Sequence, residues 1–200
     1  MKNLLKYSIL LAFAAGASAF ASDVDLSKSK VIWKGTKVIG SSHTGEVKLK
    51  SADLKYEKGE PVSGKIVVDM TSLTNTDLSG KMAAKLVGHL KSDDFFSVEK
   101  HKTATLDIKK ISKASEKFYL IQGDLTIKGQ KQAVKLKAEI TKDSKKMQTV
   151  LVDFDFDRTK YGIKYGSGSF FTDLGDKMIS DEVNLKVELT IKKSSKLAAN

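Results

Sequence analysis

Hydrophobic and polar residues alternate with a period of two along most of this chain. The alternation is clearest at residues 134–140 and 182–191, where each apolar residue is followed by a charged or polar one. Successive side chains of a strand point to opposite faces, so each segment has one face for a core and one for solvent. Six further segments share the pattern, and together they predict about eight strands. These segments are residues 31–37, 45–49, 66–70, 104–108, 119–127 and 150–156.

The strands are predicted to be antiparallel and to close on themselves. Lys58-Gly59-Glu60-Pro61 and Lys128-Gly129-Gln130-Lys131 separate neighbouring strand segments and are typical of hairpin turns. The sequence predicts no set of helices that could cover the apolar face of an open sheet. Closure hides that face and removes unpaired edges, and eight strands enclose an interior about one ligand wide. We therefore expect an all-β fold, an antiparallel eight-stranded barrel in a single domain.

Two segments depart from the alternation. Between residues 79 and 90, Met82, Leu86 and Leu90 recur at helical spacing, so one short helix is expected. Residues 159–180 contain four glycines and four aromatic residues and have no sustained period. Loops of this length are usually functional or disordered. The second segment is therefore predicted to be a long aromatic loop.

Alternation alone does not say whether the barrel interior is filled by side chains or hollow. Glycines stand within the strand patterns at residues 35, 45, 64 and 123. Glycine in a strand leaves space or marks a bend. This composition favours a hollow interior.

Residues 1–21 are predicted to be a secretory signal peptide. Two lysines precede the apolar run 7–15, which is too short to span a membrane, and small residues follow it. Cleavage sites are present after Ala19 and after Ala21, and we favour the second. The chain has no cysteine, so a lipid anchor on cysteine, disulfides and thiol chemistry are all excluded. We expect residues 22–200 to form a soluble periplasmic domain.

The chain is basic, with 35 Lys+Arg against 24 Asp+Glu and a formal net charge of +11 at pH 7. Only Arg158 is an arginine, whereas recognition of bases and phosphates favours the planar guanidinium. Many lysines alternate with apolar residues, as at 135–137, which is typical of the solvent face of a sheet. The pattern argues against nucleic acid as a partner. It leaves a weak, transient attraction to an anionic membrane surface.

The sequence contains no motif for catalysis or metal binding. His43, His89 and His101 lack metal-ligand spacing, and the G-x-S-x-G motif of serine hydrolases is missing. The aspartates at 153, 155 and 157 alternate with large apolar residues, so we interpret them as an outward face. The lone Arg158 follows them. Its planar fork suits either a buried carboxylate or the head group of a ligand, and both interpretations stay open.

Several motifs, in the same order, resemble the YceI-like family. Residues 88–96, GHLKSDDFF, are similar to the family's HLKSxDFF signature, and residues 122–129, QGDLTIKG, to its GDLTIxG strand and turn. Residues 156–163 and 180–183 resemble its last two strands and the loop between them. Lys102 and Ala133 stand where prolines are common in the family, which affects only local turns. The resemblance implies an exported, lipocalin-like barrel that holds a polyisoprenoid or other long-chain lipid, without catalysis or a cofactor.

The alternation and the resemblance together predict which residues contact such a lipid. A hydrocarbon chain would lie against inward-facing strand residues and the aromatic loop at the mouth. A polar or anionic head group would need donors, whereas a quinone would need only neutral ones such as tyrosine. The predicted apolar lining is Trp33, Val68, Leu106, Ile108, Tyr119, Ile121, Phe154, Phe156, Phe170, Phe171, Leu185 and Val187. The predicted head-group contacts are Arg158, His89, Tyr161 and Tyr165.

Two alternatives from other functional classes are kept. One is an enzyme acting on a lipid, with His43 or His89 as base, although no spacing favours it. The other is a packed barrel with an envelope-stress or surface role that binds a protein partner, and this alternative predicts no internal cavity. Formation of a homodimer is also left open.

Overall fold

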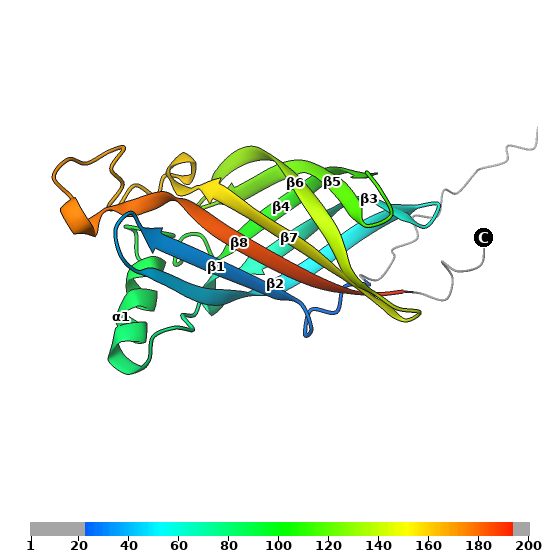
Figure 1. The fold of residues 1–200 in the computed structure, drawn as a ribbon, viewed down its shortest axis with the longest axis horizontal. Helices are drawn as coiled ribbons and strands as arrows, with labels where there is room; N and C mark the ends of the chain where they lie inside the picture. Colours follow the sequence, from blue (N-terminus) through cyan, green and yellow to red (C-terminus); the bar gives the residue numbers. More distant parts are fainter. Residues whose placement is uncertain (1–22, 194–200) are drawn as a thin grey trace, which may run out of the picture.

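The computed structural model describes residues 23–193, so the predicted signal peptide at 1–21 lies outside the described residues. The described chain is an elongated closed barrel (Figure 1). Each strand pairs antiparallel with its neighbours in sequence, and β8 pairs with β1. The predicted fold class is thereby confirmed. The strands are β1 (Lys30–Lys37), β2 (Ser42–Glu57), β3 (Glu60–Asp69), β4 (Thr103–Lys113), β5 (Phe118–Ile127), β6 (Gln130–Asp143), β7 (Met147–Asp157) and β8 (Ile179–Lys192).

Two predicted turns form tight hairpins. Lys58 and Gly59 join β2 to β3 with φ of 48° and 82°, and Lys128 and Gly129 join β5 to β6 with φ of 48° and 74°. Positive φ at both central positions is typical of type I′ turns, whose twist matches that of the flanking strands. Glycine at the second position adopts this conformation without steric cost.

The two ends of the barrel are built differently. The helix end carries the β1–β2 hairpin, the helix α1 (Gly80–Lys91) and the loop of residues 162–178, all on the same side in Figure 1. At the turn end, the connections β2–β3, β4–β5 and β6–β7 are short, and Val24 pairs with Ile191. Among the described residues, no helix is long and apolar enough to cross a membrane. Three 3-10 helices complete the fold: η1 (Met70–Ser72), η2 (Arg158–Tyr161) and η3 (Gly175–Lys177).

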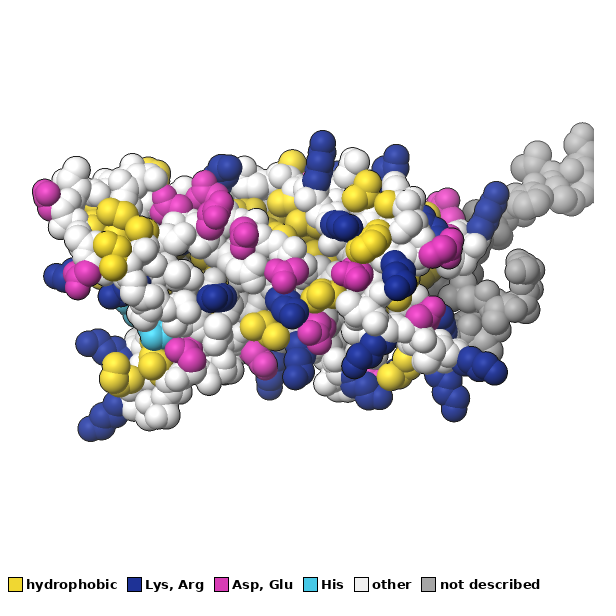
Figure 2. Space-filling model, viewed as in Figure 1, with side chains coloured by type: hydrophobic (Ala, Val, Ile, Leu, Met, Phe, Trp, Pro, Cys, Tyr) yellow, Lys and Arg dark blue, Asp and Glu magenta, His cyan; other side chains and the backbone are white. Residues whose placement is uncertain are grey.

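The outer wall of the barrel is charged, as the alternation predicts. Figure 2 shows lysine and acidic side chains interspersed over the strands. The aspartates of β7 lie on this wall, where Asn184 Nδ2 donates to Asp153 Oδ1 and to Asp155 Oδ1, each at 2.9 Å. The interpretation of these aspartates as an outward face is confirmed.

Most of the strand glycines allow close contacts. A Cβ at Gly64 would lie 2.9 Å from the side chain of Leu54, and one at Gly123 would lie 2.5 Å from the carbonyl oxygen of Asp107. At Gly45 a Cβ would meet Trp33 Cζ2 at 2.5 Å and the Thr74 carbonyl still closer. Only Gly35 of the four has open space around it. These glycines therefore allow neighbouring backbone and side-chain atoms to pack closely, more than they leave the interior hollow.

Gly45→Ala should destabilise the barrel, because the added methyl displaces Trp33, whose Nε1 donates to Thr74 O at 3.1 Å. Overpacking of this kind costs about 1–3 kcal/mol. Gly35→Ala is the matched control, since a Cβ there meets nothing within 4 Å. Urea unfolding of both variants measures the difference. Equal free energies of unfolding for the two variants would contradict this account of Gly45.

Candidate functional site

A cavity of about 930 Å³ occupies the interior of the barrel. It is lined by residues of all eight strands, of α1 and of the loops at both ends. Pockets for small molecules span about 300–1,000 Å³, so this cavity belongs among the large ones. The packed-barrel alternative predicts no such cavity, and the structure contradicts it on that point.

The strand positions predicted to face inward lie on the cavity. The alternation of β8 is typical: Val183, Leu185, Val187, Leu189 and Ile191 all line it. The predicted lining residues that the structure places on the cavity are Trp33, Val68, Leu106, Ile108, Tyr119, Ile121, Phe154, Phe156, Leu185 and Val187.

Phe170 and Phe171 do not line the cavity. They are 47% and 50% exposed in the loop 162–178. The Nζ of Lys164 lies 4.4 Å from the centroid of the Phe170 ring, a cation–π contact at the surface. Their prediction as lining residues is wrong because the loop has no alternation that could tell inward from outward positions.

Sequence reasoning missed several lining residues outside the strands. Phe95 is 7% exposed and Ile163 is fully buried, and both line the cavity, as do Met70 and Leu73 after β3. Phe95 follows α1 in a turn in which its N–H donates to Ser92 O at 3.1 Å. The signal for Phe95 was present, since it belongs to the GHLKSDDFF motif. Met70 is in phase with the alternation of residues 66–70, whereas Leu73 and Ile163 carry no periodic signal.

His89 and Tyr165 meet at the helix end of the cavity. The two rings are edge-to-face with centroids 4.6 Å apart, and His89 makes a similar contact with Phe95 at 4.9 Å. The His89 Nε2 also lies 3.2 Å from Asp94 Oδ2. His43, on β2, lines the same end and pairs through Nδ1 with Asp77 Oδ2 at 2.8 Å. Two of the predicted head-group residues are thus brought together.

Tyr161 does not join them. It is 2% exposed and packs edge-to-face on Phe156, with ring centroids 5.5 Å apart, outside the cavity lining. Burial raises the pKa of the Tyr161 phenol to about 12, and the nearby carboxylate of Asp157 adds to the shift. Tyr161 is therefore a core residue of the barrel wall, and its prediction as a head-group contact is wrong.

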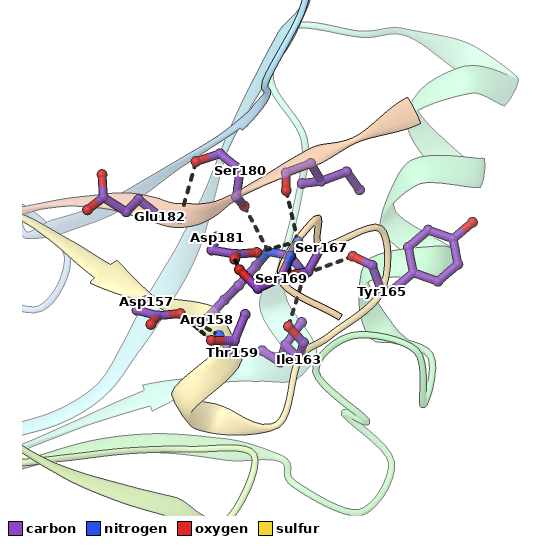
Figure 3. A network of polar contacts seen from close by, with 11 residues as sticks. Asp157, Arg158, Thr159, Ile163, Tyr165, Ser167, Ser169, Ser180, Asp181 and Glu182 are labelled. Atoms are coloured by element: carbon purple, nitrogen blue, oxygen red, sulfur yellow. Dashed lines mark hydrogen bonds and ion pairs between the residues drawn. The ribbon is translucent and has the colours of Figure 1, made fainter. Parts of the chain in front are cut away.

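Arg158 is 2% exposed and holds the loop 162–178 against β8 (Figure 3). Its Nε donates to Ser180 O at 2.8 Å. One terminal nitrogen donates to Ile163 O at 2.9 Å and to Tyr165 O at 2.8 Å. The other donates to Ile179 O at 3.1 Å and to Asp181 Oδ1 at 3.3 Å.

A guanidinium has five N–H donors, and each of those of Arg158 has a protein acceptor. None remains for the head group of a ligand, although part of the side chain borders the cavity. Of the two interpretations that the sequence left open, the structure supports the ion pair with a carboxylate, here Asp181, although the side chain of Asp181 is 26% exposed and not buried. Burial lowers the pKa of Arg158, and the carboxylates of Asp181 and Asp157 oppose that shift.

Arg158→Met should unfold the loop 162–178 and destabilise the whole barrel. The variant leaves four carbonyl groups without their donor, and each buried polar group left unsatisfied costs about 1–3 kcal/mol. Arg158→Lys should recover little of this, because an ammonium cannot reach five acceptors arranged around a planar fork. Denaturant unfolding followed by far-UV circular dichroism measures both. Wild-type stability in Arg158→Lys would show that charge alone, without the fork, is sufficient.

Asp181 should make stability depend on pH. Burial raises its pKa, but hydrogen bonds from Ser167 and Ser169 and the charge of Arg158 outweigh burial, so the pKa of Asp181 is lowered. A carboxyl whose pKa is lower in the folded state stabilises the fold above its unfolded value, about 3.9, and this stabilisation is lost as pH falls through the folded value.

Asp181→Asn should therefore lose stability at pH 7 and should show a flatter decline of the free energy of unfolding below pH 4 than the wild-type protein. Denaturant unfolding at several pH values measures the two slopes. Parallel declines in the two proteins would contradict the role of Asp181.

The turn end of the cavity is also polar. Tyr119 Oη donates to Glu60 Oε2 at 2.7 Å, and Lys113 Nζ lies 3.2 Å from Glu116 Oε1 and 3.6 Å from Glu60 Oε1. Burial and the hydrogen bond to Glu60 raise the pKa of Tyr119. The cavity thus has polar groups at both ends and an apolar wall between them. Further charged residues at this end are Asp143, Lys145, Lys146, Lys192 and Lys193.

The described residues contain no group of three or more His, Cys, Asp or Glu that could hold a metal ion. Each histidine on the cavity is paired with an aspartate. Within residues 23–193, no hydrogen bond joins either of them to a serine, threonine or lysine side chain. The pairing of nucleophile and base that covalent catalysis requires is not found in this part of the chain.

Comparison with known proteins gives the family. A family model of the YceI-like domain matches residues 23–191. The chain belongs to the YceI-like family. No curated protein sequence matches this YceI-like chain.

Three solved structures illustrate the likeness of fold. Burkholderia cenocepacia BcnA is 26% identical with a TM-score of 0.67, over 84% of this chain and 99% of that one. A Campylobacter jejuni YceI protein is 22% identical with a TM-score of 0.59, over 74% and 85%. A polyisoprenoid-binding domain from Saccharophagus degradans, implicated in plant cell wall breakdown, is 14% identical with a TM-score of 0.65, over 86% and 97%.

Proposed function

We propose that this YceI-like protein binds one long-chain lipid of the polyisoprenoid or quinone type inside its barrel, in the periplasm, after export. The observation that carries the proposal is the cavity of about 930 Å³, which has an apolar wall along the barrel and polar groups at its two ends. This distribution matches an amphiphile with a long hydrocarbon chain and a small polar head.

In this proposal the apolar wall supplies most of the favourable binding free energy. Burying several hundred Å² of a lipid's apolar surface contributes on the order of 10 kcal/mol at about 25 cal/mol per Å², before the costs of ordering the chain. The binding protein then needs few polar contacts. His89 and Tyr165 remain as hydrogen-bonding partners for a head group, because the donors of Arg158 are taken by protein acceptors.

The relatives and the site agree with binding in preference to catalysis. One structural neighbour is named for polyisoprenoid binding, and its fold is similar to that of this chain. The signal-peptide pattern at 1–21 supports export. The lipid-enzyme alternative lacks a paired nucleophile among the described residues.

Native mass spectrometry of the protein purified from its own host's periplasm tests the proposal. A stoichiometric adduct that organic extraction identifies as a prenyl lipid or quinone would support it. An apo mass that persists after incubation with both lipid classes would overturn it and would favour a protein partner.

Ala138→Phe should abolish lipid binding, because the ring would project from the barrel wall into the cavity. Ala138 is 2% exposed and lies on the cavity wall in β6. Lys135→Phe is the matched control, since it adds the same ring to the exposed face of the same strand. Adduct occupancy in native mass spectra and a melting curve of each variant measure binding and folding separately. Full occupancy in a folded Ala138→Phe variant would place the lipid outside the barrel.

A further inference from the structure

Large hydrophobic side chains are exposed mainly at the helix end. Val38 and Ile39 on the β1–β2 hairpin are 59% and 67% exposed, and Met82 on α1 is 68% exposed. With Phe170 and Phe171 of the loop 162–178, these five residues are here called the tip surface. Single exposed apolar residues are ordinary, whereas a group of them indicates an interaction site.

The three segments of the tip surface are neighbours. Val38 N–H donates to Met178 O at 2.9 Å, which joins the hairpin to the end of the loop. His89 and Tyr165 stack edge-to-face at 4.6 Å, which joins α1 to the start of the same loop. Segments far apart in sequence therefore present their apolar side chains at one end of the barrel, where Figure 2 shows hydrophobic side chains with both lysines and acidic side chains beside them.

Lysines flank these side chains. Lys81 and Lys85 stand on either side of Met82 along α1, and Lys164 covers the ring of Phe170 at 4.4 Å. Lys37 and Lys177 belong to the same segments, and the five lysines outnumber the two carboxylates of the loop, Asp173 and Asp176. Within residues 23–193, none of these five lysines has an ion-pair partner. Exposed apolar tips with unpaired lysines beside them are typical of surfaces that insert shallowly between anionic lipid head groups.

The cavity reaches the same end. Lys37, Ser41, His43, His89 and Tyr165 line it beside the tip surface. A bilayer seated there would face this end of the cavity.

We propose that the tip surface is a docking site for an anionic phospholipid bilayer. Docking itself is independent of what the cavity holds; only exchange of a ligand with the bilayer rests on the proposed lipid binding. The lysines favour a surface rich in phosphate groups over a neutral one. The hairpin, the helix and the loop are separate protrusions, which a deformable bilayer can accommodate.

Co-sedimentation of the full domain with phosphatidylcholine vesicles, with and without phosphatidylglycerol, tests the proposal. Wild-type protein should bind the anionic vesicles, and added salt should weaken binding. The triple variant Ile39→Ser, Met82→Ser, Phe171→Ser should lose about tenfold or more in affinity, since three inserting side chains are removed. Leu120→Ser is the matched control: Leu120 is 50% exposed on β5, toward the turn end. Its affinity should stay at the wild-type value.

Equal binding of the triple variant and the wild-type protein would overturn the proposal. So would a dimer in size-exclusion chromatography that the triple variant dissociates while neither protein binds vesicles, because the occupant would then be a second copy of this chain. Ala138→Phe separates the two proposals. This variant should still bind anionic vesicles although it carries no lipid adduct. Loss of lipid binding and loss of docking are therefore distinguishable outcomes.

Discussion

The pairing of β8 with β1 is the constraint on which the rest of the structure depends. The alternating strands each carry one apolar face, and only a closed sheet can hide all of these faces without help from other layers. Closure also fixes the interior volume, because eight strands leave a space that their side chains need not fill. The cavity is therefore a result of the strand number and of the medium-sized residues that face inward, and not of any single side chain.

The polar groups of the cavity lie at its two ends, near the points where strand pairing stops. Arg158 is the first residue of η2, directly after β7. Its guanidinium donates hydrogen bonds to four backbone carbonyl groups of the following loop and of β8. Buried carbonyls without donors would be costly, so one guanidinium allows an irregular loop to pack against a barrel rim. At the opposite end no such loop exists within the described residues, and short turns are sufficient.

The strands could be predicted from sequence because their signal is local. The period of two in β8 identified its inward residues from Val183 to Ile191. The loop offered no such signal: Tyr161 turned inward into the wall, and Phe170 turned outward. The role of Arg158 depends on acceptors up to 23 residues away in sequence, and only the folded chain brings them together. Gly45 was recognised as unusual, but its close contact with Trp33 requires the register between β1 and β2.

The helix α1 has no buried residue in any of its 12 positions, although Leu86 and Leu90 border the cavity. The partly buried Leu86, Val87 and Leu90 pack against the core, so lifting α1 away would expose these side chains, but no strand pairing would break. Stability is distributed unevenly in such a fold: the ladder of hydrogen bonds opens only on global unfolding, whereas a half-buried helix opens at a small fraction of that free energy. Amide hydrogens in α1 should accordingly exchange with solvent through local fluctuations, whereas those of the barrel strands should exchange only through global unfolding.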